Sequence, residues 1–83
     1  MNSNEVFNGI QKIIKNIIFE VADISPSTNL IDLGITSILF IEIIVSIELK
    51  FDIEFDDEDL LFDNFIDVNS LFEYVVERKV FTL

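Results

Sequence analysis

The chain has 83 residues, of which 51% are hydrophobic, and its 5 basic and 16 acidic side chains give a net charge of −11 at pH 7. It contains no cysteine and no histidine, which excludes disulfide bridges, histidine-based catalysis and zinc sites built on these residues. The length permits one domain over residues 1–83 with a compact core, and the acidic charge disfavours nucleic acid and anionic membranes as partners.

The first third of the sequence predicts one helix followed by a long ordered loop. Apolar residues at helical spacing predict a helix that begins after a cap at Ser3 or Asn4 and ends near Ala22. Residues 23–34 contain proline, serine, threonine, asparagine and glycine, a composition typical of a loop. Four apolar side chains should hold this loop against the core: Ile24, Leu30, Ile31 and Leu33.

The remainder of the chain predicts three more helices. The second runs from about Ser37 to Lys50, and a short third helix spans roughly residues 57–63. A fourth begins after a cap at Asp67 or Asn69 and extends through an apolar, then basic, segment. The fold class is therefore all-α, a small four-helix bundle with one long loop between the first two helices and a short third helix.

The second helix has two apolar faces. One face should join the first and fourth helices in the core, and it consists of Phe40, Ile43, Ile44 and Ile47, with Phe51 following. The fold has only about three other helices, one of them short, and these cannot also cover the opposite face. We therefore expect that face to stay partly exposed until a partner covers it. A tighter bundle or a homodimer is the alternative, but we favour a monomer. The opposite face consists of Ile38, Ile41, Val45 and Leu49, with Glu42 interleaved and Glu48 at its flank.

Ser37 lies at the predicted start of this helix, beside the surplus apolar face. The free N–H groups and the positive end of the helix dipole favour a phosphate at such a position. A serine there also serves as an ordinary helix cap. From the residues alone, both roles stay open.

The segment around this serine resembles the central segment of acyl and peptidyl carrier proteins. Residues 32–37 read DLGITS, with the serine opening a helix, and residues 51–55 read FDIEF. Residues 67–78, DVNSLFEYVVER, are similar to the last helix of that family. The resemblance follows the family order over nearly the whole chain.

The resemblance implies that the chain is a carrier and not an enzyme. Ser37 would receive a 4′-phosphopantetheine arm from coenzyme A through a phosphopantetheinyl transferase, and the thiol of the arm would hold acyl or aminoacyl groups as thioesters. The other implied partners are an adenylating or acyl-loading enzyme and a synthase or condensing enzymes. The recognition surface implied by the family is Ile38, Ile41, Glu42, Val45 and Glu48.

Two departures from fatty-acid carriers bear on the pathway. Thr36 precedes the serine where those carriers usually have aspartate, and Leu39 and Leu49 stand where they tend to be acidic or polar. A less charged docking helix is more similar to carriers of nonribosomal-peptide or polyketide pathways, which we favour here. A fatty-acid-type carrier is the alternative.

Two rival functions use the acidic segment or the exposed face. Carboxylates from Asp52 onward approximate a calcium-binding loop, but Asp57 occupies the position that needs glycine, and Asp63 replaces the final glutamate. We therefore expect a solvated helix entrance and no metal site. An acidic interaction module that docks by the same apolar face would need no prosthetic group at Ser37.

Charge distribution and the beginning of the sequence bear on partners and location. Four of the acidic residues precede Thr36 and twelve lie between Glu42 and Glu77, so electrostatic recognition should fall to the second half. The sequence begins without the basic and apolar regions of a signal peptide, and no apolar run reaches the roughly 18–20 residues of a membrane span. We expect a cytoplasmic protein.

Overall fold

A computed structural model describes residues 2–18 and 23–81 of the chain. The described residues form three α-helices and no strand: α1 (Ser3–Ile17), α2 (Ser37–Phe51) and α3 (Val68–Phe81). Two short 3-10 helices, η1 (Asp57–Asp59) and η2 (Phe62–Asn64), lie between α2 and α3. The all-α fold class is confirmed, but the predicted count of four helices is not.

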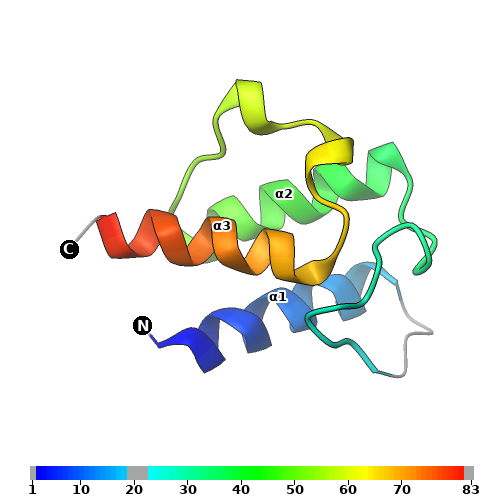
Figure 1. Cartoon of the computed structure of the whole chain (residues 1–83), viewed down its shortest axis with the longest axis horizontal. Helices are drawn as coiled ribbons and strands as arrows, with labels where there is room; N and C mark the ends of the chain where they lie inside the picture. The colour runs from blue at the N-terminus through cyan, green and yellow to red at the C-terminus, as the bar shows by residue number, and fades with distance from the viewer. Residues whose placement is uncertain (1, 19–22, 82–83) are drawn as a thin grey trace.

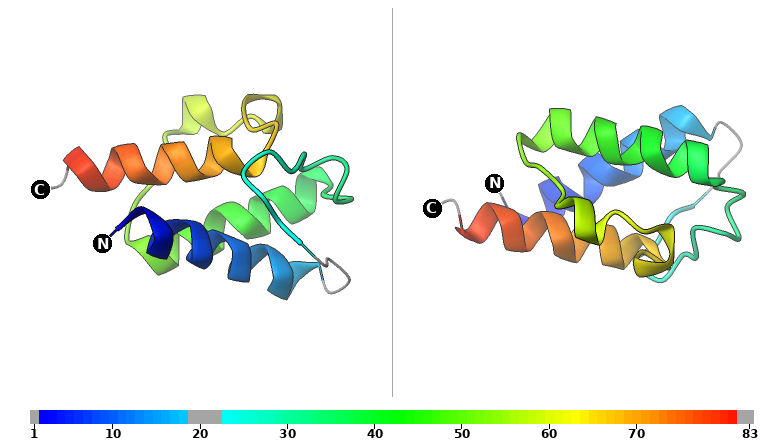
Figure 2. Two further views of the ribbon diagram at one scale, coloured as in Figure 1. Left: turned by 60° about the horizontal axis from the view of Figure 1, so that its bottom comes forward. Right: turned by 90° about the horizontal axis from the view of Figure 1, so that it is seen from above.

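The three helices form a bundle in which α1 runs opposite to α2 and α3 (Figure 1). The start of α1 and the end of α3 lie at one end of the bundle, and the long loop and the start of α2 lie at the other (Figures 1 and 2). None of the described helices is long and apolar enough to cross a membrane.

The start of α1 differs slightly from its prediction. Asn2 is the N-cap, because its side-chain oxygen accepts a hydrogen bond from the N–H of Glu5 at 2.9 Å. The predicted cap at Ser3 or Asn4 is therefore wrong by one or two residues. Asparagine and serine are both good caps, so their order in the sequence could not decide between them.

The end of α1 also comes earlier than predicted. Ile18 has an extended backbone, and its N–H closes the last helical turn on the carbonyl of Ile14 at 2.8 Å. The predicted end near Ala22 lies outside the described residues.

The core forms on the face of α2 that was predicted to be buried. Phe40, Ile43, Ile44, Ile47 and Phe51 are all buried, which confirms that prediction. α1 packs against both α2 and α3. The buried side chains that α1 and α3 contribute are Val6, Ile10, Ile13, Ile14, Val68, Leu71 and Val75.

Gly9 allows α1 to approach α2 closely. A Cβ atom added at this glycine would lie 2.7 Å from Cζ of Phe51 and 2.8 Å from Cε of Lys50. The ring of Phe51 is only 2% exposed and cannot move away freely. The crossing of the two helices thus requires the absence of a side chain at position 9.

Replacing Gly9 with alanine is expected to destabilise the fold, because the added methyl group overpacks the crossing at a cost of up to about 3 kcal/mol. The gain in helix propensity, about 1 kcal/mol, offsets only part of this cost. Urea unfolding followed by circular dichroism measures the change. Asn8→Ala, at an exposed position one residue earlier, is the matched control and should be neutral or stabilising. A stabilised Gly9→Ala protein would contradict the close approach.

The predicted third helix over residues 57–63 is replaced by η1 and η2. Between them the chain is extended at Leu61, which lets the ring of Phe62 stack on Phe40 at a centroid distance of 4.9 Å. A seven-residue helix has little stability of its own, so such tertiary contacts determine the local conformation. The apolar spacing of this segment is compatible with an α-helix, but the predicted helix is wrong because the segment forms two 3-10 helices.

Phe65 fills the space between α2 and α3. It is 4% exposed, and its ring lies 5.7 Å from that of Phe40 on α2 and 5.9 Å from that of Tyr74 on α3. Phe55 completes the cluster, because its ring stacks on Tyr74 at 4.3 Å. The segment between α2 and α3 is thus part of the core.

Candidate functional site

The loop before α2 is held by hydrogen bonds to the segment that precedes α3. The N–H of Leu30 donates to the carbonyl of Ile66 at 2.9 Å, and the N–H of Val68 donates to the carbonyl of Thr28 at 3.0 Å. Leu30 is fully buried beneath this pairing. The loop that leads to the candidate serine is therefore fixed to the bundle.

A turn at Asn29 decides which residues of this loop enter the core. The side-chain oxygen of Asn29 accepts hydrogen bonds from the N–H groups of Ile31 at 2.8 Å and Asp32 at 3.1 Å. Ile31 is 68% exposed, so its predicted packing against the core is wrong, whereas Ile35 is 4% exposed and takes that role. The other three predictions for this loop hold, because Ile24 and Leu30 are buried and Leu33 packs against the core.

Gly34 brings the chain out of the turn. Its φ of 83° lies in the left-handed region that favours glycine, and nothing within 4 Å would otherwise exclude a side chain. The N–H of Ile35 donates to the carbonyl of Leu30 at 3.2 Å, which turns Ile35 inward. The chain then enters α2 through Thr36.

Thr36, and not Ser37, is the N-cap of α2. Its Oγ1 accepts a hydrogen bond from the N–H of Leu39 at 3.3 Å, and its carbonyl accepts one from the N–H of Phe40 at 2.8 Å. Ser37 is exposed, and its hydroxyl forms no hydrogen bond with a described residue. The alternative in which Ser37 caps the helix is thereby excluded, and its hydroxyl is left accessible.

The start of α2 offers a suitable environment for a phosphodiester at Ser37. The N–H groups of Ser37 and Ile38 have no acceptor within the described part of the chain, and the first turn contains no acidic residue. Free N–H groups and the positive end of the helix dipole stabilise a negative charge at this position. The residues present therefore fit a phosphate group attached to the serine.

The face of α2 beside Ser37 is apolar and exposed, as its spacing predicted. Four aliphatic side chains on this face remain in water, although full burial of each would stabilise the protein by roughly 1.5–3 kcal/mol. Such surfaces usually mark interaction sites. The exposed fractions are 75% for Ile38, 49% for Ile41, 47% for Val45 and 81% for Leu49. We call these four residues the α2 strip.

The two acidic residues predicted on this face differ in their surroundings. Glu42 is exposed. Glu48 is partly buried, and its Oε2 accepts a hydrogen bond from the N–H of Phe55 at 3.0 Å, which ties the chain after α2 back to the helix. The structural role of Glu48 was not predicted, because it depends on a turn that the sequence does not mark. The roles of both residues in partner binding remain predictions.

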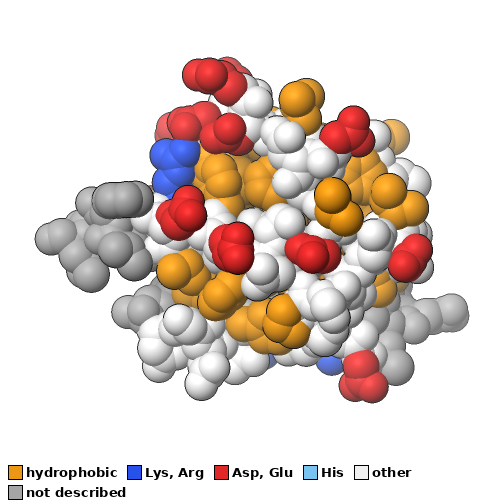
Figure 3. All heavy atoms as spheres, viewed as in Figure 1, with side chains coloured by type: hydrophobic (Ala, Val, Ile, Leu, Met, Phe, Trp, Pro, Cys, Tyr) orange, Lys and Arg blue, Asp and Glu red, His pale blue; other side chains and the backbone are white. Residues whose placement is uncertain are grey.

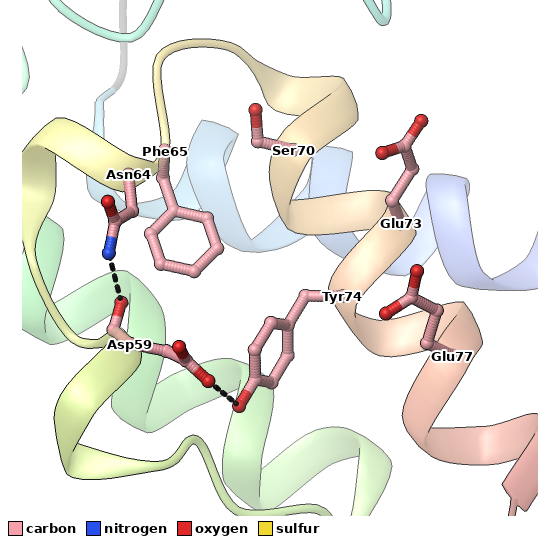
Figure 4. A pocket seen from close by; sticks show the side chains of 7 residues that line it. All are labelled: Asp59, Asn64, Phe65, Ser70, Glu73, Tyr74 and Glu77. Carbon is pink, nitrogen blue, oxygen red and sulfur yellow. Dashed lines mark hydrogen bonds between the residues drawn. The ribbon is translucent and has the colours of Figure 1, made fainter.

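An acidic groove lies between η1, η2 and α3. Its lining includes Asp59, Asn64, Phe65, Tyr74 and Glu77 (Figure 4). The hydroxyl of Tyr74 donates to Asp59 at 3.3 Å, and Asn64 donates to the carbonyl of Asp59 at 3.4 Å. The first bond attaches η1 to α3, and the second joins η2 to η1.

Arg78 contributes a positive charge to this acidic region. It pairs with Asp56 and, at 3.9 Å, with Asp59, and it also donates to the hydroxyl of Tyr74. The hydrogen bond to Asp56 raises the pKa of Arg78, so the guanidinium stays charged at any ordinary pH. Figure 3 shows this face of the molecule, on which acidic side chains are widespread and basic side chains are scarce. Among the described residues, no three acidic side chains converge on a metal position.

The structure thus presents an exposed serine at the start of a helix, beside an apolar strip, in a small all-α domain. Residues 8–75 match the sequence model of the family described as "Phosphopantetheine attachment site". The chain is 36% identical to an acyl carrier protein of Desulforapulum autotrophicum over 61 residues, which cover 72% of this chain and 77% of that protein. It is 30% identical to aminoacyl carrier protein 1 of Bradyrhizobium diazoefficiens over 83 aligned positions, covering 96% of this chain and 87% of the relative.

The chain therefore belongs to the phosphopantetheine-attachment family of carrier proteins. It is a carrier and not an enzyme, and its prosthetic group is 4′-phosphopantetheine attached covalently to a serine. Carriers of this kind work with enzymes such as transferases and synthases.

Proposed function

We propose that Ser37 is the serine that carries the arm, and that the chain holds acyl or aminoacyl intermediates as thioesters in a nonribosomal-peptide or polyketide pathway. The observation that carries the assignment is the exposed, unbonded hydroxyl of Ser37 at the start of α2, where Thr36 already provides the cap. The arm supplies the thiol that a chain without cysteine lacks.

The residues around Ser37 have separate tasks in this proposal. The N–H groups of Ser37 and Ile38 stabilise the phosphodiester, and Gly34 sets the turn that brings the serine to the surface. The α2 strip, with Glu42 and Glu48, receives the transferase, the adenylating or acyl-loading enzyme and the synthase in turn. The enzymes perform the chemistry, and the carrier presents the cargo.

The apolar character of the α2 strip supports the choice of pathway. The relatives include one named as an acyl carrier and one named as an aminoacyl carrier, so their names agree with both cargo classes. Leu39 and Leu49 make the docking helix less charged than that of a fatty-acid-type carrier, which is the alternative. Loading assays with amino acid-adenylating and malonyl-transferring enzymes distinguish an aminoacyl cargo from the malonyl cargo that polyketide and fatty-acid carriers share.

Coexpression with a broad-specificity phosphopantetheinyl transferase tests the attachment site. Intact mass spectrometry should show a gain of one phosphopantetheine, and fragmentation should place it on Ser37. Ser25, Ser27, Ser46 and Ser70 are internal controls within the same spectrum. An arm on another serine, or an unmodified protein that still binds its partner through the α2 strip, would refute the assignment in favour of an interaction module.

Replacing Ile41 with aspartate is expected to reduce loading by a partner enzyme at least tenfold, because a charge enters the centre of the proposed docking face. Ile41 is 49% exposed, so the free energy of unfolding should change by less than about 1 kcal/mol. Ile44→Asp is the matched control on the opposite face, where the side chain is 2% exposed and the substitution should unfold the protein. A large loss of stability in Ile41→Asp would place Ile41 in the core.

A further inference from the structure

A shallow groove runs between α1 and α2, along one side of the α2 strip. Its near part, towards Ser37, is lined by Ile17, Ile41 and Val45, together with the carboxylate-bearing Glu42. Its far part is lined by Lys12, Leu49 and Lys50, and the two parts meet at Ser46. The groove therefore changes from mostly apolar, with one carboxylate, to cationic with distance from the attachment serine.

The two lysines at the far end carry uncompensated charge. The chain has 16 acidic residues, yet Lys12 and Lys50 form no ion pair with any of those that the structure describes. Arg78, by contrast, pairs with Asp56 and Asp59. An anion at the groove end would meet two ammonium groups that form no ion pair with a described carboxylate.

Gly9 directs one of these lysines across the groove. The Cε atom of Lys50 lies 2.8 Å from the position that a Cβ of Gly9 would occupy, so the stem of Lys50 lies over α1 at the glycine. Lys12 is three residues further along α1, on the same side of that helix. Both ammonium groups are thereby brought to one end of the groove.

The spacing along α2 suits a tethered occupant. Lys50 is thirteen residues after Ser37, which corresponds to about 20 Å along the helix axis. This span is comparable to the reach of a phosphopantetheine arm with a short acyl group. A molecule fixed at Ser37 can therefore follow the apolar part of the groove and end at the lysines.

We propose that the groove between α1 and α2 receives the loaded arm, and that Lys12 and Lys50 bind a free carboxylate at the end of the acyl group. The cargo class would then be acyl groups with a second, unesterified carboxylate. This inference rests on attachment at Ser37. It adds Lys12 of α1, as a residue that selects the cargo, to a proposed docking face that lies on α2 alone.

Two matched cargoes test the proposal. A broad-specificity transferase loads the protein from coenzyme A analogues carrying a succinyl or a butyryl group through a stable amide in place of the thioester. These groups have the same number of carbons, and only the succinyl group has a carboxylate. Amide chemical shifts of ¹⁵N-labelled protein should differ between the two forms at Lys12, Ser46, Leu49 and Lys50. Apart from residues close to Ser37, the other amides should have the same shifts in both forms.

Variants separate recognition by the lysines from mere proximity. The double variant Lys12→Gln/Lys50→Gln should lose the difference between the two cargoes, whereas Lys15→Gln, at an exposed position of α1 outside the groove lining, should retain it. The proposal is overturned if the groove residues show the same chemical shifts with both cargoes. It is also overturned if the difference between the cargoes persists in the double variant, or if neither cargo shifts the groove residues. Failure to gain mass from either analogue would instead refute attachment itself.

Discussion

Replacing Ser37 with alanine is expected to abolish phosphopantetheine attachment completely and to leave the fold intact. The hydroxyl forms no hydrogen bond with a described residue, and Thr36 caps α2 independently of it. Alanine is also a favourable residue in the first turn of a helix. The free energy of unfolding should therefore change by no more than about 0.5 kcal/mol. Intact mass after coexpression with a transferase, together with thermal unfolding, measures both effects.

Thr36→Ala provides the opposite pattern and serves as the control. It removes the cap bond to Leu39 and should cost about 1 kcal/mol of stability, while Ser37 remains available for modification. The two adjacent substitutions thus separate the hydroxyl that stabilises the helix from the one that is modified. A Ser37→Ala protein that still gains the mass of the arm would disprove the assignment.

Among substitutions by alanine, the largest effect on stability is expected from Phe65→Ala. Phe65 is 4% exposed and contacts aromatic rings on both sides, Phe40 on α2 and Tyr74 on α3. Removing a buried phenyl ring costs about 3–5 kcal/mol, because a cavity remains. For a chain of this length the total stability is about 4–12 kcal/mol, so the variant should be partly or fully unfolded at 37 °C.

Urea titration monitored by circular dichroism measures this loss, and Phe62→Ala is the comparison. Phe62 stacks on Phe40 but is only partly buried, so its removal should cost clearly less than removal of Phe65. Equal losses in the two variants would show that Phe65 does not have the central position between α2 and α3 that the ring distances indicate.

The parts of the fold that the sequence predicts well are those determined by local periodicity. The start of α2 was predicted at Ser37 and its end at Lys50, one residue short of Phe51, and both of its faces were assigned correctly. A long helix with consistent spacing leaves little freedom to tertiary contacts. The cap of α3 at Asp67 was likewise named as one of two alternatives, and its carboxylate accepts from the N–H of Ser70 at 2.9 Å.

The parts that could not be predicted depend on contacts between distant segments. Residues 57–63 have helix-compatible spacing, but the stacking of Phe62 on Phe40 and the hydrogen bond from Tyr74 to Asp59 favour two short 3-10 helices instead. In the first loop, Ile35 is buried in the core in place of the predicted Ile31, because the side chain of Asn29 accepts hydrogen bonds that turn the chain there. Composition marks both segments as irregular without giving their geometry.

The candidate site shows the same division. The sequence indicates Ser37 through its position and resemblance, and the α2 strip through surplus apolar residues. Thr36 is a departure from the pattern of fatty-acid carriers, and a threonine directly before the helix is also a signal for the cap. The bond from Phe55 to Glu48 has no such signal, because it joins the helix to a turn without glycine or proline.

The bond between Glu48 and Phe55 affects how the proposed docking face would meet a partner. With Glu48 engaged internally, Glu42 is the main free carboxylate among four exposed aliphatic side chains. Association through such a face derives its free energy from dehydration of hydrocarbon, which gives a negative change in heat capacity. Despite a net charge of −11, the affinity should therefore respond only weakly to ionic strength.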